Sequence, residues 1–403
     1  MTLVPALLAQ YVMGFLAQLG MGIVAPVLPV LQRDFGLSVG EVTLVFALFG
    51  VARLVSDVPV GHLADRVPRA LLLLTGLAGL AGGAVLCAVA PTYPLLLAGR
   101  IVQGLGSSLT YTTSQIILVS AVSAHHRGRA MGLYQAANLA GMVLSPPIGG
   151  VITALAGWRA AFAFCALATA LGFVSVFLTR RLLGKRAEAR RAHAAAAELP
   201  ALPRLSARGL LAINWLSFNF FFVGQGITNT LVPLYGGTVL HLSPVILGLA
   251  LGLAGSVRVV ISLVGGVVSD RSGRRTVLVP GAVALGAGVA AITLAQDAPS
   301  FVAIVTVGAF GRLGNGVAAT LLADLTPRER LGRTLGFNRF VGDFGQTAGP
   351  LLVGWWIDAI GYGPTTWIVA AMVWAAALTL LAWVPESLPP DRARRTVAPP
   401  PAR

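Results

Sequence analysis

Two pairs of opposite charges lie inside long apolar runs of this 403-residue chain. Arg53 precedes Asp57 by four residues, and Arg339 precedes Asp343 by the same spacing. On a helix this spacing puts both side chains on one face, so each pair can neutralise itself. Burial disfavours the charged form of a carboxyl group and a nearby arginine favours it, so an arginine that moves away would let its acid bind a proton.

Asp343 is our first candidate for an acid that binds and releases a coupling proton, and Asp57 is the second. Asp343 lies about ten residues into its apolar run, which at about 1.5 Å per residue is near the middle of a bilayer. Arg339, Arg53 and Arg100 are the arginines expected to act on these acids. The alternative is that both pairs are static and hold helices in register.

Three arginines in apolar runs have no acid within one turn of their own helix: Arg100, Arg258 and Arg312. Each needs a partner from another helix, a backbone carbonyl group or an anionic substrate. Amide and aromatic side chains in the same runs are candidates to line a substrate cavity with Arg258 and Arg312. They are Gln18, Gln115, Gln135, Asn138, Asn219, Phe222, Gln225 and Asn338. Such a cavity suits amphipathic molecules, and interhelical packing bonds are the alternative role for the amides.

Membrane-spanning helices must position these residues. In the whole chain, 56% of the residues are hydrophobic and 11% are charged, and the mean hydropathy is +0.82. Soluble domains contain about 25% charged residues, and a helix needs about 20 apolar residues to cross a bilayer. Apolar runs of this length recur, and we expect twelve spans. They lie at 4–31, 39–63, 70–90, 94–120, 129–153, 158–179, 209–236, 244–268, 276–296, 299–324, 333–357 and 364–384.

The formal net charge of +15 is distributed unevenly. Arginines concentrate in alternate loops and in the segments 180–208 and 386–403, while the other loops contain only Arg33 and Arg159. This positive-inside pattern predicts that both termini lie in the cytoplasm, and it argues against a nucleic-acid partner. The predominance of arginine, alanine and glycine suggests a bacterial coding sequence, so we expect a bacterial inner-membrane protein. We expect 180–208 to be a basic linker near anionic lipid and 386–403 to be a disordered tail.

The two halves of the chain repeat. Residues of the first half that recur at a constant offset are Gly50, Arg53, Gly61, Asp65 and Arg66, with the counterparts Gly255, Arg258, Gly266, Asp270 and Arg271. Two parallel six-helix bundles, here 1–179 and 209–385, are a transporter architecture in which the bundles rock around a central site. The predicted fold class is therefore an all-α membrane protein with twelve spans in two pseudo-symmetric bundles.

A similar loop follows the second span of each half. Its residues are Gly61, Asp65, Arg66 and Arg69 in the first copy, and Gly266, Asp270, Arg271 and Arg274 in the second. Glycine allows close helix approach, and an aspartate at a helix end can form ion pairs with the arginines beyond it. Ion pairs that break and re-form would act as a gating latch between two states. Simple anchoring of charge at the membrane surface is the alternative.

Glycines and prolines cluster in the fifth span of each half. The set is Gly141, Pro146, Pro147, Gly149 and Gly150 in the first half, and Gly345, Gly349 and Pro350 in the second. Glycines four residues apart let a neighbouring helix pack on bare backbone, and prolines kink a helix. We predict a bendable hinge at the interface of the halves, and close packing alone is the alternative.

Both loops resemble the signature G-x-L-A-D-R-x-G-R-R of the major facilitator superfamily. The second copy keeps the later glycine as Gly273, while the first has Pro68 in its place. Arg100, Gln103 and Gly104 resemble the R-x-x-Q-G motif, which implies assistance to proton transfer. The resemblance covers residues from about 10 to 385 and implies the major facilitator fold.

Two further segments resemble the twelve-helix drug:proton antiporter branch of that superfamily. Leu19-Gly20 followed by Pro26-Val27-Leu28-Pro29 resembles its first-helix motif, and the run that ends Ser145-Pro146-Pro147-Ile148-Gly149-Gly150 resembles G-x-x-x-G-P-x-x-G-G. Ser145 replaces a glycine that the second half retains as Gly349. The resemblance implies alternating access and proton-driven efflux of lipophilic or cationic compounds.

Other function classes are disfavoured. An ATP-driven pump would need G-x-x-x-x-G-K-[ST], and the only lysine, Lys185, is followed by arginine. The segment from Gly106 to Ser108 lacks the arrangement of a serine nucleophile, and the repeat argues against a channel. We expect no enzyme activity, no cofactor and no metal site at His125 and His126. The expected partners are a small-molecule substrate, protons and lipid, with the chain a monomer.

Among transporters, a carrier of an anionic or sugar-like metabolite remains the alternative to export. Five arginines and two clear aspartates inside the expected spans would make a cavity positive, and the first span contains no acidic residue. The substrate, the direction of transport and the coupling ion stay open at this point.

Overall fold

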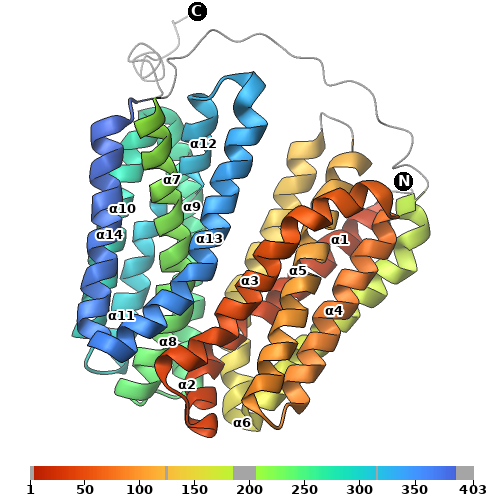
Figure 1. Cartoon of the computed structure of the whole chain (residues 1–403), viewed down its shortest axis with the longest axis horizontal. Coiled ribbons are helices and arrows are strands. Elements are labelled where there is room, and N and C mark those ends of the chain that lie inside the picture. Colours follow the sequence, from red (N-terminus) through yellow and green to blue (C-terminus); the bar gives the residue numbers. More distant parts are fainter. Residues whose placement is uncertain (1–3, 123–125, 185–205, 315, 387–403) are drawn as a thin grey trace, which may run out of the picture. The chain divides into compact units, whose positions relative to one another are not determined.

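The structure is a computed structural model that describes residues 4–122, 126–184, 206–314 and 316–386 (Figure 1). This part of the chain is helical and contains no β-strand. The predicted all-α class is therefore confirmed. Most of the expected linker and nearly all of the expected tail lie outside the described residues, as does His125.

The first half folds into long helices with few interruptions. They are α1 (Val4–Gly22), α2 (Val24–Phe35), α3 (Val39–Arg66), α4 (Arg69–Val89), α5 (Tyr93–Ala121) and α6 (Arg127–Gly184). The first expected span is thus two consecutive helices. The fifth and sixth spans form α6, which turns at Gly157, where a φ of 79° favours glycine. Pro146 and Pro147 do not break α6.

The second half is more irregular. Its elements are α7 (Ala207–Phe222), η3 (Val223–Leu231), α8 (Val232–Leu234), η4 (Tyr235–Val239), α9 (Pro244–Ser272), α10 (Arg274–Ala291), η5 (Ile292–Leu294), α11 (Ala298–Gly308), η6 (Ala309–Gly314), α12 (Val317–Asp324), α13 (Arg328–Ile360) and α14 (Tyr362–Trp383). The segments η3 and η4 are π-helices, whereas η5 and η6 are 3₁₀-helices. The seventh expected span, which we call helix 7, extends from α7 to η4. It therefore contains two π-segments, which the sequence patterns did not predict.

All twelve expected spans have a helical counterpart among these elements. By length and hydropathy alone, nine helices of the described residues are able to cross a membrane, and one of them covers two expected spans. The set excludes α5 and α13. These two helices carry Arg100 and the Arg339–Asp343 pair, so candidate functional charges lie on both long helices outside the set.

The described chain forms two compact units. The first comprises Met1–Ala196 and Pro233–Gly252, and the second comprises Ala197–Val232 and Leu253–Arg403. The division near residue 196 falls within the expected linker. The segment Pro233–Gly252, which we assigned to the second bundle from sequence, groups instead with the first unit.

Close packing on α6 explains where that segment belongs. A Cβ atom at Gly248 would lie 2.3 Å from the Pro146 carbonyl oxygen, and one at Gly252 would lie 2.3 Å from the Pro147 ring. Gly150 lies equally close to the carbonyl oxygen of Pro244. Glycines on both partners thus let this segment pack on α6 at backbone distance.

In the first unit, α1 and α2 pack along α6. A Cβ at Gly141 would lie 2.3 Å from the Phe15 carbonyl oxygen, and one at Gly149 would lie 2.9 Å from the Ile23 backbone. The hydroxyl group of Ser145 lies between these glycines and donates to the Leu19 carbonyl oxygen. Ser145, which replaces a motif glycine, therefore contributes a hydrogen bond in place of bare backbone.

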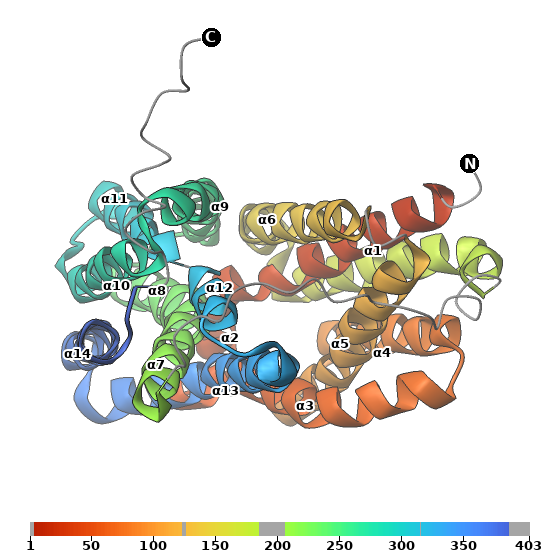
Figure 2. The ribbon, with the colours of Figure 1, turned by 90° about the horizontal axis from the view of Figure 1, so that it is seen from above.

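The second unit repeats this contact between α7–η3 and α13. A Cβ at Gly345 would lie 2.6 Å from the Phe218 carbonyl oxygen, and one at Gly349 would lie 2.8 Å from that of Phe222. Figures 1 and 2 show α10 beside α14 in the same unit. The predicted close approach of these glycines is present, and bending there stays a prediction.

Candidate functional site

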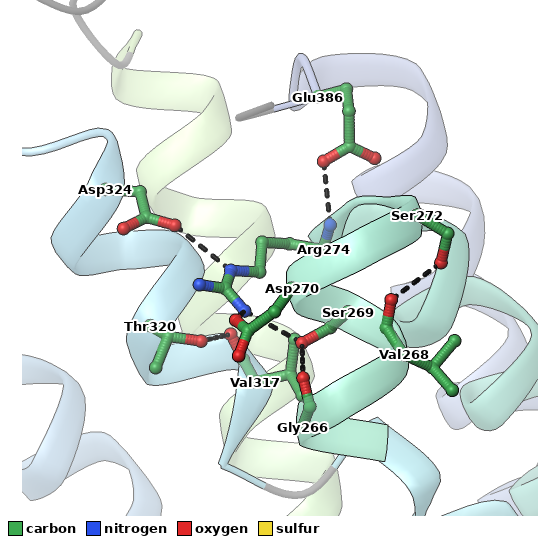
Figure 3. Close-up of polar contacts among 10 residues, drawn as sticks. All are labelled: Gly266, Val268, Ser269, Asp270, Ser272, Arg274, Val317, Thr320, Asp324 and Glu386. Atoms are coloured by element: carbon green, nitrogen blue, oxygen red, sulfur yellow. Dashed lines mark hydrogen bonds and ion pairs between the residues drawn. The ribbon is translucent and has the colours of Figure 1, made fainter. Parts of the chain in front are cut away.

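A polar cluster lies in the second unit where α9 ends and α10 begins (Figure 3). Arg274 donates to the Asp270 carboxylate, and its Nη1 atom also donates to the Ser269 hydroxyl group at 2.8 Å. Its Nε atom donates to the Asp324 carboxylate at 3.1 Å. The Arg274 side chain is 17% exposed, while those of Asp270 and Asp324 are 66% and 38% exposed, so the ion pairs are shielded from water mainly on the arginine side. The expected ion pair of this loop is present, and Asp324 adds a second.

Glu386 completes this group, which we call the Arg274 cluster. Its Oε1 atom accepts from the Arg274 backbone N–H at 2.8 Å, and its Oε2 atom accepts from that of Arg275 at 3.1 Å. The first N–H groups of a helix lack partners within the helix and favour negative charge. Gly273, at φ 107°, leaves room for the carboxylate, because a Cβ there would lie 2.6 Å from it.

Glu386 was not among the site residues predicted from sequence. It follows the last apolar run, and its partners lie more than a hundred residues earlier. The only signal was an isolated acid, Glu386, before an arginine-rich tail. Sequence spacing does not indicate which helix terminus such an acid would cap.

The first copy of the loop differs from the second. The Arg69 Nη1 atom donates to the Ser120 hydroxyl group on α5 at 2.8 Å, while Arg66 is exposed. The Asp65 side chain lies outside those the structure describes. Arg271 of the second copy is exposed and makes no ion pair among the described residues. The structure therefore joins Asp270 and Arg274 of the predicted latch and leaves Arg66 and Arg271 apart.

Gly61 and Gly266 do not make the close helix contact that we expected. A Cβ at either position would meet no described atom within 4 Å. In the second unit the neighbouring Gly265 makes this contact instead, since a Cβ there would lie 2.1 Å from the Leu313 carbonyl oxygen. One residue rotates the contact face by about 100° on a helix, which explains why Gly265 and not Gly266 faces η6.

Asp343 forms the ion pair that the sequence predicted. The Arg339 Nε atom lies 2.8 Å from its Oδ2 atom. The Asp343 side chain is 12% exposed and that of Arg339 is 46% exposed. The acid is thus largely buried, while its arginine is the more exposed of the two.

Asp57 does not pair with Arg53, which corrects our expectation of a self-neutralising pair. The Ser108 hydroxyl group donates to the Asp57 carboxylate, and the Arg53 guanidinium group lies 5.2 Å from the centre of the Tyr111 ring. Both new partners are on α5. The Asp57 carboxylate and the Arg53 guanidinium group each contact a side chain of α5, and they form no ion pair with each other. The Nε atom of Arg53 is buried and makes no hydrogen bond among the described residues.

Arg100 is fully enclosed between α5 and α3. Its Nε atom donates to the Val45 carbonyl oxygen at 2.9 Å, and its Nη1 atom donates to the Gln103 Oε1 atom at 2.6 Å. The Phe49 ring centre is 4.7 Å from the guanidinium carbon, and that of Phe46 is 5.9 Å away. Such contacts to carbonyl groups and aromatic faces stabilise a buried arginine without a carboxylate.

The amides predicted to line a cavity mostly make internal bonds. Asn138 donates to the Tyr134 carbonyl oxygen, Asn219 donates to that of Trp215, and Asn229 donates to the Gln225 side chain. Gln18, Gln115 and Gln135 make no hydrogen bond among the described residues, and none is fully buried. These three are the predicted cavity amides whose side chains make no hydrogen bond within the described part of the chain.

Phe222 does not line an open surface, contrary to our expectation. It is fully buried on α7, where its ring packs against Phe218 and Trp356. Its position opposite Gly349 explains the burial, because α13 comes within backbone distance there.

Asn338 links α13 to α7 in the second unit. Its Nδ2 atom donates to the Asn214 Oδ1 atom at 3.1 Å and to the Ser217 hydroxyl group at 2.9 Å. We expect Asn338→Ala to lower the free energy of unfolding by about 1 kcal/mol, because two partners lose a donor. Thermal unfolding of the solubilised protein would measure this. A change in substrate preference with unchanged stability would instead support the cavity role.

Among the described residues no group of three or more histidine, cysteine, aspartate or glutamate side chains lies together. Cys87 and Cys165 are buried free thiols.

Comparison with known proteins agrees with this picture. A family model described as Major Facilitator Superfamily matches residues 11–271 and 241–402. The class G tetracycline resistance protein of Vibrio anguillarum is 27% identical over 389 residues, which cover 93% of this chain and 96% of that protein. The quinolone resistance protein NorA of Staphylococcus aureus is 27% identical over 160 residues, which cover 40% of this chain and 41% of that protein.

Solved structures share the fold at low sequence identity. A D-xylose–proton symporter has a TM-score of 0.73 and 17% identity, and covers 96% of this chain and 99% of its own. A POT family transporter in complex with a thioalcohol-conjugated peptide has a TM-score of 0.76 and 12% identity, with 93% and 95% covered. With the family model matching most of its length, the chain belongs to the major facilitator superfamily.

Proposed function

We propose that this protein exports small amphipathic or drug-like molecules in exchange for protons, by alternating access across a bacterial inner membrane. As a superfamily member it is a multi-pass membrane transporter and not an enzyme. Two relatives whose names denote resistance to tetracycline and to quinolones support export. The arginine-rich alternate loops support a cytoplasmic location of both termini.

The Arg339–Asp343 pair is the observation that carries proton coupling. Asp343 lies near the middle of α13, is largely buried and has the more exposed Arg339 as its ion-pair partner. A nearby arginine favours the charged form of a carboxyl group, and burial disfavours it. A conformational change that separates the two side chains would thereby bind a proton.

Asp57 is the second candidate for a coupling acid. The Ser108 hydroxyl group donates to its carboxylate, and a hydroxyl group can equally accept from a protonated acid. The site therefore suits either protonation state. Arg53, held over Tyr111 and not on Asp57, would act on the acid only after a rearrangement.

The Arg274 cluster is the proposed gate. Its two ion pairs join the end of α9 to α12, and Glu386 joins the start of α10 to the segment after α14. Such a group favours one of two conformations by the bonds that exist only in that conformation.

Inverted membrane vesicles test the proposal. A transmembrane proton gradient is established, cationic, neutral and anionic compounds are added, and collapse of the gradient is recorded for wild type, Asp343→Asn and Asp57→Asn. We expect particular compounds to collapse the gradient, with loss of the response in Asp343→Asn because an amide binds no proton. Asp358→Asn, the same change at an exposed position of α13, is the matched control.

Three outcomes would contradict parts of this proposal. No collapse with any compound would reject proton-driven export. Retention in Asp343→Asn with loss in Asp57→Asn would move the coupling acid to α3. Retention in both variants would remove both acids from the mechanism.

An anionic or sugar-like metabolite is the second candidate substrate. Arg312 of the second unit favours it, because this arginine is buried and forms no ion pair among the described residues. Uptake of such compounds down an imposed proton gradient would identify this function.

A further inference from the structure

We propose that Arg312 and Arg258 bind an anionic group, such as a carboxylate, of the transported molecule. This inference rests on the proposed transport function and names the chemistry of its substrate. An amphipathic substrate that carries a carboxylate would be compatible with the proposed export and would also supply the anionic group. The site belongs to the second unit, where helix 7 is π-helical.

Arg312 is buried, with 5% of its surface exposed, in the 3₁₀-segment η6. Its Nη1 atom donates to the Phe220 carbonyl oxygen at 2.8 Å, and its Nη2 atom donates to the Thr228 hydroxyl group at 3.3 Å. Both partners are neutral, and Arg312 forms no ion pair among the described residues. A guanidinium group has five N–H donors, so these two bonds leave donors for a further partner.

The end of α7 and the π-segment η3 supply the two groups that accept hydrogen bonds from Arg312. Phe220 is in α7 and Thr228 is in η3, so the arginine spans the start of the π-helical turn. A Cβ at Gly224 would lie 3.2 Å from the Nη1 atom and 3.4 Å from the Nη2 atom. Bare backbone therefore faces both terminal nitrogens. π-helical turns inside α-helices occur frequently at functional sites.

Arg258 adds a second positive charge to this place. It is partly buried on α9, and its charge acts on Arg312. Gly265, two turns further along the same face of α9, packs against the carbonyl oxygen of Leu313, the residue after Arg312. The face of α9 that carries Arg258 is thus turned toward η6. Two like charges in a low-dielectric region repel, and a shared anion removes that cost.

Arg100, Gln103 and Gly104 of the first half recur in the second half as Arg312, Asn315 and Gly316, so Arg100 is the counterpart of Arg312 in the repeat. Arg100 is held by Gln103, by a backbone carbonyl group and by two aromatic faces. Arg312 has a carbonyl group, one weak hydroxyl contact and a neighbouring cation. The same position of the repeat is therefore satisfied internally in one half and incompletely satisfied in the other.

Three naphthalene probes separate charge from shape. They are 1-naphthoate, 1-naphthalenemethanol and 1-naphthylmethylammonium, which share a ring system and differ in charge. Calorimetric titration of the purified full-length protein would measure their affinities. We expect wild type to bind naphthoate about tenfold to a hundredfold more tightly than the alcohol, since a charged hydrogen-bond pair contributes that much.

Variants of Arg258 provide the decisive comparison, because substitution of Arg312 would also remove its hydrogen bonds to Phe220 and Thr228. We expect Arg258→Gln to lose about tenfold in naphthoate affinity with the alcohol unchanged, and Arg258→Lys to retain most of the preference. Arg33→Gln removes the same charge at an exposed position and is expected to change nothing. Arg312→Lys serves as the second variant, with its folding checked by thermal unfolding.

The inference is overturned if wild type binds the three probes alike, binds the ammonium probe best or binds none at millimolar concentration. Equal weakening of all three probes in Arg258→Gln would also overturn it, because this indicates a structural role. Vesicle assays with the same probes distinguish the two proposals. Proton exchange without a naphthoate preference rejects the anion site alone, whereas a naphthoate preference without proton exchange rejects the coupling alone.

Discussion

Gly141→Ala is expected to destabilise the protein by about 3 kcal/mol, a large part of the roughly 5–15 kcal/mol that usually stabilises a folded domain. The added Cβ atom would lie 2.3 Å from the Phe15 carbonyl oxygen and 3.1 Å from the Leu19 nitrogen. Both are backbone atoms, so α1 must move away from α6. This displacement also strains the adjacent hydrogen bond from Ser145 to Leu19.

Gly132→Ala provides the matched control on the same helix. A Cβ at Gly132 meets no described atom within 4 Å, and alanine is a better helix former by up to about 1 kcal/mol. Thermal unfolding in detergent should therefore give opposite shifts for the two variants. Equal shifts would mean that α1 and α6 do not approach as closely as described.

Arg274→Gln is expected to reduce transport at least about tenfold while the protein still inserts and folds. The change removes both ion pairs and leaves the carboxylates of Asp270 and Asp324 without their common partner. A loss of about 1.4 kcal/mol from one of two conformations changes their ratio tenfold. Because Arg274 is 17% exposed, we expect a loss of this order and not that of a fully buried pair.

Arg271→Gln separates a latch from simple charge anchoring. Arg271 carries the same charge in the same loop, is exposed and makes no ion pair among the described residues. If the loop charges only anchor the protein at the membrane surface, both variants should lose activity equally. Initial transport rates, normalised to the amount of inserted protein, would show which holds.

Sequence alone was sufficient for the helices and their order. Apolar runs indicate membrane spans, because a helix needs about 20 apolar residues to cross the hydrocarbon core of a bilayer. Few other structures contain apolar runs of this length. Gly157 marked a break between two such runs without any sign that both would join as α6. The π-helical turns of helix 7 had no signal, because Gly224, Gly226 and the threonines nearby suit an ordinary span equally well.

The candidate sites were less predictable from sequence, because spacing describes one helix at a time. The Arg339–Asp343 pair was predictable, since both partners are on α13. Arg53 and Asp57 have the same spacing, yet side chains of α5 separate them. Residues that act across helices, such as Glu386, become visible only when the fold brings distant segments together.

The separation of Glu386 from Arg274 also has a consequence for biosynthesis. The two residues are 112 positions apart, so the start of α10 is made long before the carboxylate that caps it. At about 5–20 residues per second the ribosome needs roughly 6 to 20 seconds to cover that distance. The first-half contact between Arg69 and Ser120 spans only 51 positions. The hydrogen bonds of the two loops therefore form at different times during synthesis. Those of the second loop are complete only after α14 has left the ribosome.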